Sequence, residues 1–522
     1  MSYGIVTQRS NYRHIKINLS SWINIIIYNE TKTVNKGDST THSHDGEKTE
    51  CTPTYIADTN FNDEKCKSKF WDGKTSSSIR HFLTLLILGI CTWGVLWVGW
   101  GSSWGWNGEY FVLALVAIVA WGSGLLLQEL TSLPPLLAAL LTGILARYLN
   151  VLDMRQYTDI DGFLRKIYPI VILGKGSLAW DVTYMRSNWA QVVSLGVLPW
   201  VTEVTVLAAM TNILLGFPWI WGFMLGSVYA SVSCPVVMPL VIKHSKLAGG
   251  KRNWPQFVCT AGGIDTALSV GVFGMLYSFL FYETDETYRY VKASLSLLAG
   301  IALGVSWGAL AGLLPDSRDY YATELRILLV ILGALSGNFV TSFFGWGGTA
   351  GVAVLACNAT AATYWAREGW RLNCNPAATA YRVFWAACEP VLFAYTGTFF
   401  VIDSSITEAS LVPGFAILAV CLSVRLSVVC LACWRLSLKE KLFVCCTWTP
   451  KSIVEAVLCP IVLNTIISMQ MQDETITKYA EDIIKLIIQA ILVTTPVGYL
   501  LTSHVGPILL RSAAKDIEFS DT

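Results

Sequence analysis

The chain has 522 residues, of which 53% are hydrophobic and only 14% charged, and its mean hydropathy is +0.51. A soluble protein of this length needs more charge to cover its surface, so the composition indicates an all-α polytopic membrane protein. The net charge is +1, with 37 basic and 36 acidic residues and no basic stripe, which argues against a nucleic-acid partner.

The amino-terminal segment is polar and contains the stretch "ETKTVNKGDSTTHSHDGEKTE", a composition typical of disorder. We therefore expect a disordered cytoplasmic tail over residues 1–80, a transmembrane domain over 81–510 and a short cytoplasmic tail over 511–522. No motif for a cofactor, a nucleotide or a resident metal is present, and nothing in the sequence supports an enzyme.

Apolar runs follow one another from Phe82 onward with short connections, and each is read as a membrane span. The fourteen predicted spans are 82–100, 110–128, 134–149, 163–178, 189–214, 219–243, 256–282, 291–314, 324–345, 346–366, 380–402, 411–434, 442–465 and 480–506.

Basic and acidic loops alternate along most of this series, which is the positive-inside pattern. The pattern predicts a multi-pass protein with both termini in the cytoplasm. The basic loops are 243–252, 366–371 and 434–441, and the mostly acidic loops are 282–290, 403–410 and 471–482.

Asp265 lies in "TAGGIDTALSVGVFG" (260–274), inside a run long enough to cross a bilayer. A carboxylate at that depth costs about 3 kcal/mol or more, so an intramembrane acid is by default a functional-site hypothesis. A bound cation favours loss of its proton, whereas desolvation favours the protonated form. This competition is the basis of an antiport mechanism. The structural alternative is a helix end or a pair with a buried base.

Glu203 lies midway along the fifth span and Arg425 midway along the twelfth. One buried acid and one buried base most simply pair with each other. For this pair a structural role in helix packing is the favoured interpretation.

Prolines interrupt two spans, at Pro235 and Pro239 in the sixth and at Pro450 in the thirteenth. Proline removes a helical hydrogen bond, which membrane depth tolerates only beside a cavity or within protein. The interruptions stand in corresponding positions of the two halves, as in transporters built from inverted repeats. A plain kink is the alternative for either span alone.

Lys451 follows Pro450 directly, and Glu455 is one helical turn further. The lysine is expected to neutralise the carbonyl ends of the broken helices, and the alternative is that it extends to the membrane surface.

Four stretches carry a resemblance to a known family: "LPPLLAALLTGILAR" (133–147), "FPWIWGFMLGSVYASVSCPVVMPLVI" (217–242), "CEPVLFAYTG" (388–397) and "LKEKLFVCCTWTPKSIVEAV" (438–457). With them, the chain from about Phe82 to Leu510 resembles animal sodium/proton antiporters of the 9B group, within the monovalent cation/proton antiporter superfamily.

The resemblance implies a homodimer of fourteen-helix subunits with two inverted repeats and two discontinuous crossing helices. A mobile core would carry the ion against a dimerisation region. Asp265 matches the family's ion- and proton-binding aspartate, Glu203 and Arg425 match its buried salt bridge, and Lys451 matches a lysine beside the second helix break.

Two positions depart from the family pattern. Ile264 stands where relatives have a first aspartate or an asparagine, and isoleucine can neither ionise nor bind a cation. Glu455 stands where relatives usually have glutamine. Whether Glu455 compensates for the missing acid or pairs with Lys451 is left open by the sequence.

These observations predict an antiporter for pH homeostasis that exchanges a proton for Na⁺ or Li⁺ at Asp265, helped by main-chain carbonyls around Val236 and Val237. Its partners are these ions and the lipid bilayer, with the plasma membrane expected first and endosomal or mitochondrial membranes as alternatives. The competing functions are a proton-coupled chloride or other anion transporter on the same fold, and a scaffold or sensor without transport.

Overall fold

The computed structural model describes residues 74–520, except 107, 132, 246, 248–251, 283–285, 317, 371–374 and 402–403. The described residues all belong to one compact unit. Of the expected amino-terminal tail, residues 1–73 lie outside the described part.

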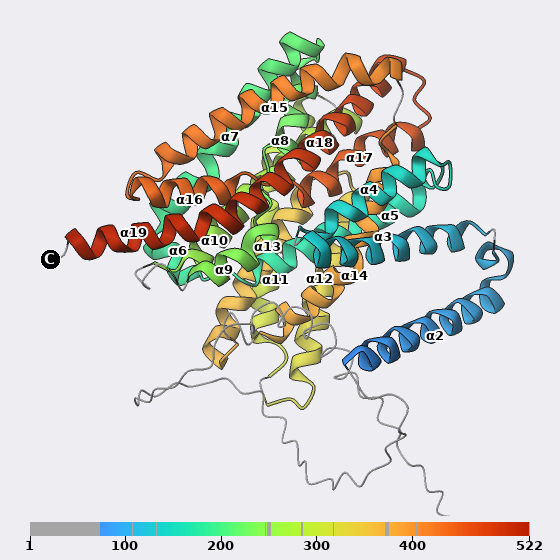
Figure 1. Cartoon of the computed structure of the whole chain (residues 1–522), viewed down its shortest axis with the longest axis horizontal. Helices are drawn as coiled ribbons and strands as arrows, with labels where there is room; N and C mark the ends of the chain where they lie inside the picture. The colour runs from blue at the N-terminus through green and yellow to red at the C-terminus, as the bar shows by residue number, and fades with distance from the viewer. Residues whose placement is uncertain are drawn as a thin grey trace, which may run out of the picture. The chain divides into compact units, whose positions relative to one another are not determined.

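Helices are the only regular elements in the described ranges (Figure 1). The first half holds α2 (Lys74–Trp100), α3 (Glu109–Thr131), α4 (Pro135–Tyr148), α5 (Thr158–Ser177), α6 (Val182–Ser187), α7 (Trp189–Leu215), α8 (Trp219–Tyr229), α9 (Cys234–Ser245) and α10 (Trp254–Phe281). The second half holds α11 (Glu286–Leu313), α12 (Ala322–Phe343), α13 (Thr349–Trp365), α14 (Pro376–Thr398), α15 (Ser404–Ala432), α16 (Leu438–Trp448), α17 (Ile453–Ser468), α18 (Glu474–Leu500) and α19 (Gly506–Ser520).

Ten of the described helices or consecutive helix pairs are long and apolar enough to cross a membrane. Their outer faces expose large aliphatic side chains, such as Val98 at 89%, Leu130 at 74% and Ile213 at 74%. Exposure of this kind on helix after helix is costly in water and favourable in lipid. The fold is therefore that of a multi-pass helical membrane protein.

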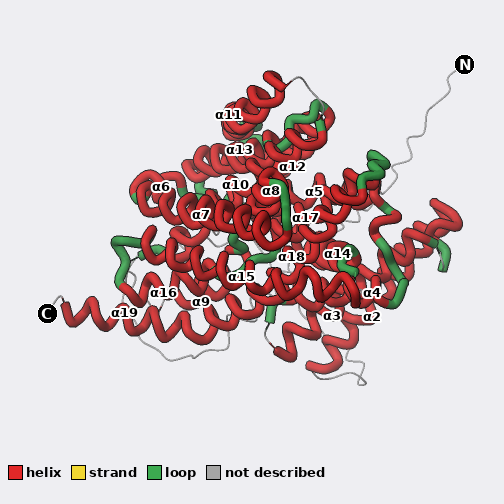
Figure 2. The backbone as a smooth tube through the Cα atoms, turned by 90° about the horizontal axis from the view of Figure 1, so that it is seen from above, coloured by secondary structure: helices red, strands yellow, loops and turns green. Residues whose placement is uncertain are grey.

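Helices far apart in the sequence form two packed groups. In one, α7 packs against α8, α10 and α15, and α18 packs against α15, α16 and α17. In the other, α4 packs against α3 and α14, and α13 packs against α11, α12 and α5. Both views show α15 alongside α7 (Figure 1; Figure 2). Contacts of α5 and α14 with α17 join the two groups.

The ninth and tenth predicted spans, 324–345 and 346–366, follow each other without a loop around "GWGG". The structure has two helices there, since α12 ends at Phe343 and α13 begins at Thr349. Gly345 and Gly348 take φ angles of 68° and 82°, a left-handed conformation that glycine adopts without strain.

Two helices are interrupted near their centres, as the prolines predict. The first gap, 230–233, separates α8 from α9, and the second, 449–452, separates α16 from α17. Pro235 occupies the first turn of α9, where the missing N–H costs nothing, and Pro450 lies within the second gap. Pro239 was expected at the interruption but lies inside α9. The break precedes Pro235 because a proline starts a helix more easily than it continues one.

Candidate functional site

Asp265 lies near the middle of α10 and is fully buried. Its Oδ1 accepts a 2.8 Å hydrogen bond from the main-chain N–H of Val232, which belongs to the first helix gap. The gap comes close because small residues precede the aspartate: a Cβ on Gly262 would lie 2.1 Å from Sγ of Cys234. The carboxylate is therefore held against an interrupted helix.

Arg425 projects from α15 and joins two buried acids, Asp265 and Glu203. Its Nη2 donates to Oδ2 of Asp265 at 2.9 Å, and its Nη1 donates to Oε2 of Glu203 and to the carbonyl of Ala230. All three charged side chains are fully buried. The ion pair of Glu203 with Arg425 was expected from the sequence, whereas the link from Arg425 to Asp265 was not.

Lys451 binds the other oxygen of Glu203, with Nζ 2.8 Å from Oε1. Nζ also donates to the carbonyl of Tyr229 at 2.5 Å and lies 4.9 Å from the centre of that tyrosine's ring. Lys451 is fully buried, so the alternative in which it extends to the surface is wrong. The carbonyls of Tyr229 and Ala230 belong to the carboxyl end of α8, where cations offset the helix dipole.

The second gap is held by α18. Oγ1 of Thr494 accepts from the main-chain N–H of Lys451 at 3.1 Å, and Oγ1 of Thr495 donates to its carbonyl at 2.6 Å. The hydroxyl of Ser452 donates to that of Ser233 at 2.6 Å, across the two gaps. These contacts fix the backbone from which Lys451 reaches Glu203.

Glu455 lies in the first turn of α17 and is fully buried. Its Oε2 accepts from the main-chain N–H of Ser452 at 2.9 Å, and among the described residues its Oε1 has no hydrogen-bond partner. The pairing with Lys451 that the sequence left open is not formed. Lys451 precedes the first helical residue, so the spacing that brings side chains together within a helix does not apply.

The remaining residues singled out in the sequence lie around this centre. Main-chain carbonyls around Val236 and Val237 were expected to help bind the cation. Both residues are inside α9, whereas the main-chain oxygens of the first gap, 230–233, lie outside helical geometry. The side chain of Ile264 faces α7, because a Cβ on Gly196 would lie 2.9 Å from its Cβ.

A second buried polar cluster was missed by the sequence analysis. On α5, Nε of Arg165 donates to Oδ2 of Asp161 at 2.5 Å, and Nη1 donates to the carbonyls of Ala456 and Val457 on α17 at 2.8 and 3.0 Å. The Ala456 carbonyl lacks its helical donor because residue 460 is a proline.

Two features of the sequence could have revealed this cluster. Asp161 and Arg165 have the four-residue spacing of a helical ion pair, and Pro460 lies within an apolar span. The predicted span began at residue 163 and excluded the aspartate, whereas α5 begins at Thr158.

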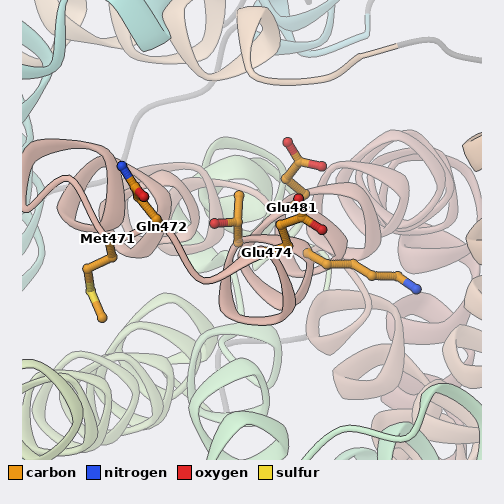
Figure 3. Close-up of a pocket in the computed structure, with 6 residues that line it drawn as sticks. Met471, Gln472, Glu474 and Glu481 are labelled. Atoms are coloured by element: carbon orange, nitrogen blue, oxygen red, sulfur yellow. The ribbon is translucent and has the colours of Figure 1, made fainter.

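A surface pocket of about 270 Å³ lies around the start of α18, lined by Met471, Gln472, Glu474, Thr477, Lys478 and Glu481 (Figure 3). From Glu474 to Thr494, which touches the second gap, α18 rises about 30 Å. The pocket is therefore remote from Asp265.

Comparison with known proteins agrees with this geometry. The sequence profile "Sodium/hydrogen exchanger, transmembrane" matches residues 111–505, and the chain belongs to the sodium/hydrogen exchanger family. This is a family of ion transporters rather than enzymes.

The chain is similar to particular members of that family. It is 27% identical to sodium/hydrogen exchanger 9B1 of Macaca fascicularis over 88% of this chain and 90% of that protein. It is 27% identical to human sodium/hydrogen exchanger 9B2 over 83% of this chain and 81% of that protein. These relatives confirm the resemblance to the 9B group.

The fold is also similar to that of a solved antiporter. The sodium proton antiporter MjNhaP1 of Methanocaldococcus jannaschii aligns with a TM-score of 0.60 and 18% identity, covering 77% of this chain and 98% of that one. The comparisons favour cation/proton exchange and lend no support to the anion transporter.

Proposed function

We propose that the protein exchanges protons for Na⁺ or Li⁺ across a membrane, with Asp265 as the group that holds either ion. The observation that carries this proposal is a fully buried carboxylate bound to the backbone of an interrupted helix and to Arg425. An acid at this depth is stable only if its charge is neutralised by a base, a proton or a metal ion.

The exchange follows from competition for the oxygens of Asp265. On one side of the membrane the deprotonated carboxylate binds the cation, helped by main-chain oxygens of the first gap. After the site has become accessible from the other side, a proton displaces the cation and resets the carboxylate. Occupancy by one ion excludes the other, so the two movements are coupled.

Glu203, Arg425 and Lys451 support the site without binding the transported ion. Arg425 fixes the orientation of Asp265. The side chains of Arg425 and Lys451 together neutralise Glu203 and the carboxyl end of α8. This assignment separates the carboxylate that exchanges ions from the one that is permanently paired.

The alternating exposure of the site is assigned to movement between the two helix groups. The group with α7, α8–α10 and α15–α18 contains every residue of the site, and the group with α3–α5 and α11–α14 contains none. We assign the second group to a homodimer interface. We assign α4, α5, α13 and α14 as further spans, which with the ten long apolar ones make fourteen in two inverted repeats. In this proposal both termini are in the cytoplasm and the protein is in the plasma membrane.

The proposal is tested by purified protein in liposomes that contain a fluorescent pH indicator. Outward gradients of sodium, lithium, potassium and chloride are imposed in turn on wild type, Asp265→Asn and the control Glu474→Gln, which changes an exposed acid at the remote pocket. Sodium or lithium should drive proton movement in wild type and Glu474→Gln but not in Asp265→Asn. Proton movement driven by chloride without sodium or lithium, or unaffected by Asp265→Asn, would contradict the proposal.

A further inference from the structure

The charges around the two helix gaps, which contact each other through Ser233 and Ser452, do not balance. Five fully buried ionisable side chains meet there: Asp265, Glu203, Glu455, Arg425 and Lys451. Three of them are acids and two are bases. The formal charge is therefore −1 when all five are ionised, in surroundings where an unneutralised charge costs several kcal/mol.

The contacts identify Glu455 as the acid without a counter-charge. Glu203 is bound by both bases and Asp265 by Arg425. No ion pair of the described residues reaches Glu455, and one of its oxygens, Oε1, is buried without a partner. A carboxylate in this state needs a proton or a cation from outside the protein.

Glu455 is connected to Asp265 through the two gaps. Ser452, whose N–H binds Glu455, contacts Ser233 hydroxyl to hydroxyl. Ser233 follows Val232, whose N–H binds Asp265. The two carboxylates therefore lie on either side of one short hydrogen-bonded segment.

Ile264 directly precedes Asp265 on α10 and contributes no oxygen to the site. Ile264 presents a hydrocarbon side chain to Gly196, so it can neither carry charge nor coordinate an ion. Against the family pattern with an aspartate at position 264 and a glutamine at 455, the site has one acid fewer on α10 and one more on α17.

We propose that Glu455 is a second cation-binding carboxylate of the transport site and supplies the negative charge that Ile264 does not. This inference rests on the proposed exchange of cations at Asp265. The ligand is a small monovalent cation, which carboxylate, hydroxyl and main-chain oxygens suit. With the cation bound, the five side chains and the ion sum to zero charge.

A purely structural role for Glu455 makes a different prediction. Its Oε2 caps the amino terminus of α17, where the helix dipole also favours an acid. Glutamine keeps the accepting oxygen and removes only the charge, so Glu455→Gln separates the two roles. Glu440 at the start of α16 is a matched control, because its Oε2 makes the same capping contact, a 2.9 Å hydrogen bond from the N–H of Ser437. Glu440 differs from Glu455 in that its side chain is partly exposed.

The experiment measures the sodium KM for flux and the sodium-induced rise in melting temperature of purified wild type, Glu455→Gln, Glu440→Gln and Ile264→Asp/Glu455→Gln. Glu455→Gln should raise KM at least tenfold and abolish the sodium-induced stabilisation. Glu440→Gln should change neither. The double variant should return KM to within about threefold of wild type, because it restores one acid to the site.

A second measurement uses the wild-type protein, in case the variants do not fold. The hydrophobic reagent dicyclohexylcarbodiimide modifies buried carboxyl groups, and the modified residues are located by mass spectrometry. Sodium should protect Glu455 from modification. Equal modification with and without sodium, or none under conditions that modify Asp265, overturns the inference.

The outcomes also distinguish this inference from the proposed function. Wild type without cation-driven proton flux refutes the proposed function itself. An active wild type, an inactive Asp265→Asn and a Glu455→Gln variant with unchanged KM and stabilisation refute only the role of Glu455. A raised KM that the double variant does not restore refutes compensation for Ile264.

Discussion

The main-chain N–H of Ser233 donates a 2.9 Å hydrogen bond to the carbonyl oxygen of Pro450. The two interrupted helices are thus joined backbone to backbone at their gaps. If the two gaps were separated, this N–H and this carbonyl would lose each other as partners, and at membrane depth an unpaired peptide group costs several kcal/mol. This contact explains how irregular backbone persists beside Asp265.

Thr495→Val tests whether α18 holds the second gap. Valine matches threonine in shape but leaves the carbonyl of Lys451 without its 2.6 Å donor. An unsatisfied buried carbonyl costs about 1–3 kcal/mol, so the melting temperature of the detergent-solubilised protein should fall and the sodium KM should rise. Thr363→Val is the control, since Thr363 is exposed on α13 and bonds only within its own helix. Equal effects of the two substitutions would contradict this role of α18.

Gly498→Ala tests the closeness of α18 to the second gap. A Cβ there would lie 2.5 Å from Cγ and 2.9 Å from N of Pro450, so one element must move. We expect transport to be lost while the protein stays folded, measured as liposome flux and as a monodisperse elution profile. Gly337→Ala on α12, where an added Cβ meets nothing within 4 Å, should retain wild-type flux. Full activity of Gly498→Ala would show that the gap tolerates displacement.

Arg425→Gln tests the central ion pairs. It removes the partner of Asp265 and one of the two partners of Glu203, all fully buried. Breaking a buried pair on one side costs about 3–5 kcal/mol, so the thermal midpoint should fall sharply. Arg435→Gln, at an exposed position beyond α15, should change stability by less than about 1 kcal/mol. A similar midpoint for both variants would remove Arg425 from its assigned role.

The Asp161–Arg165 pair gives a prediction about compensation. Arg165→Met alone leaves Asp161 buried without its base and should cost about 3–5 kcal/mol. Replacing both residues, by Arg165→Met with Asp161→Leu, should recover part of that loss, because no lone charge remains. The readout is the thermal midpoint of each variant. A double variant less stable than the single one would contradict this expectation and show that Asp161 keeps a favourable partner, Asn464, when Arg165 is absent.

The sequence allowed much of the architecture to be predicted, for identifiable reasons. Long apolar runs have few structures available in lipid, so the helices followed from hydropathy, and Pro235 and Pro450 located the interruptions within a few residues. Charged residues are rare in apolar membrane spans, so the sequence alone identifies Asp265, Glu203, Arg425 and Lys451 as candidates.

Other features depend on tertiary contacts that spacing does not encode. Lys451 and Glu455 share a helical spacing, but the chain is not helical at residue 451, so the lysine contacts Glu203 instead. Arg425 contacts Asp265 as well as Glu203 because α7, which packs against α15, also packs against α10. Asp161 was missed because it precedes the apolar run that carries Arg165.

The most direct test of the central claim counts protons when purified protein binds sodium in a weakly buffered solution. Competition at Asp265 predicts that sodium releases protons from wild type, in proportion to the sodium bound, and releases none from Asp265→Asn. Sodium binding to wild type without proton release, or equal release from Asp265→Asn, would contradict the account.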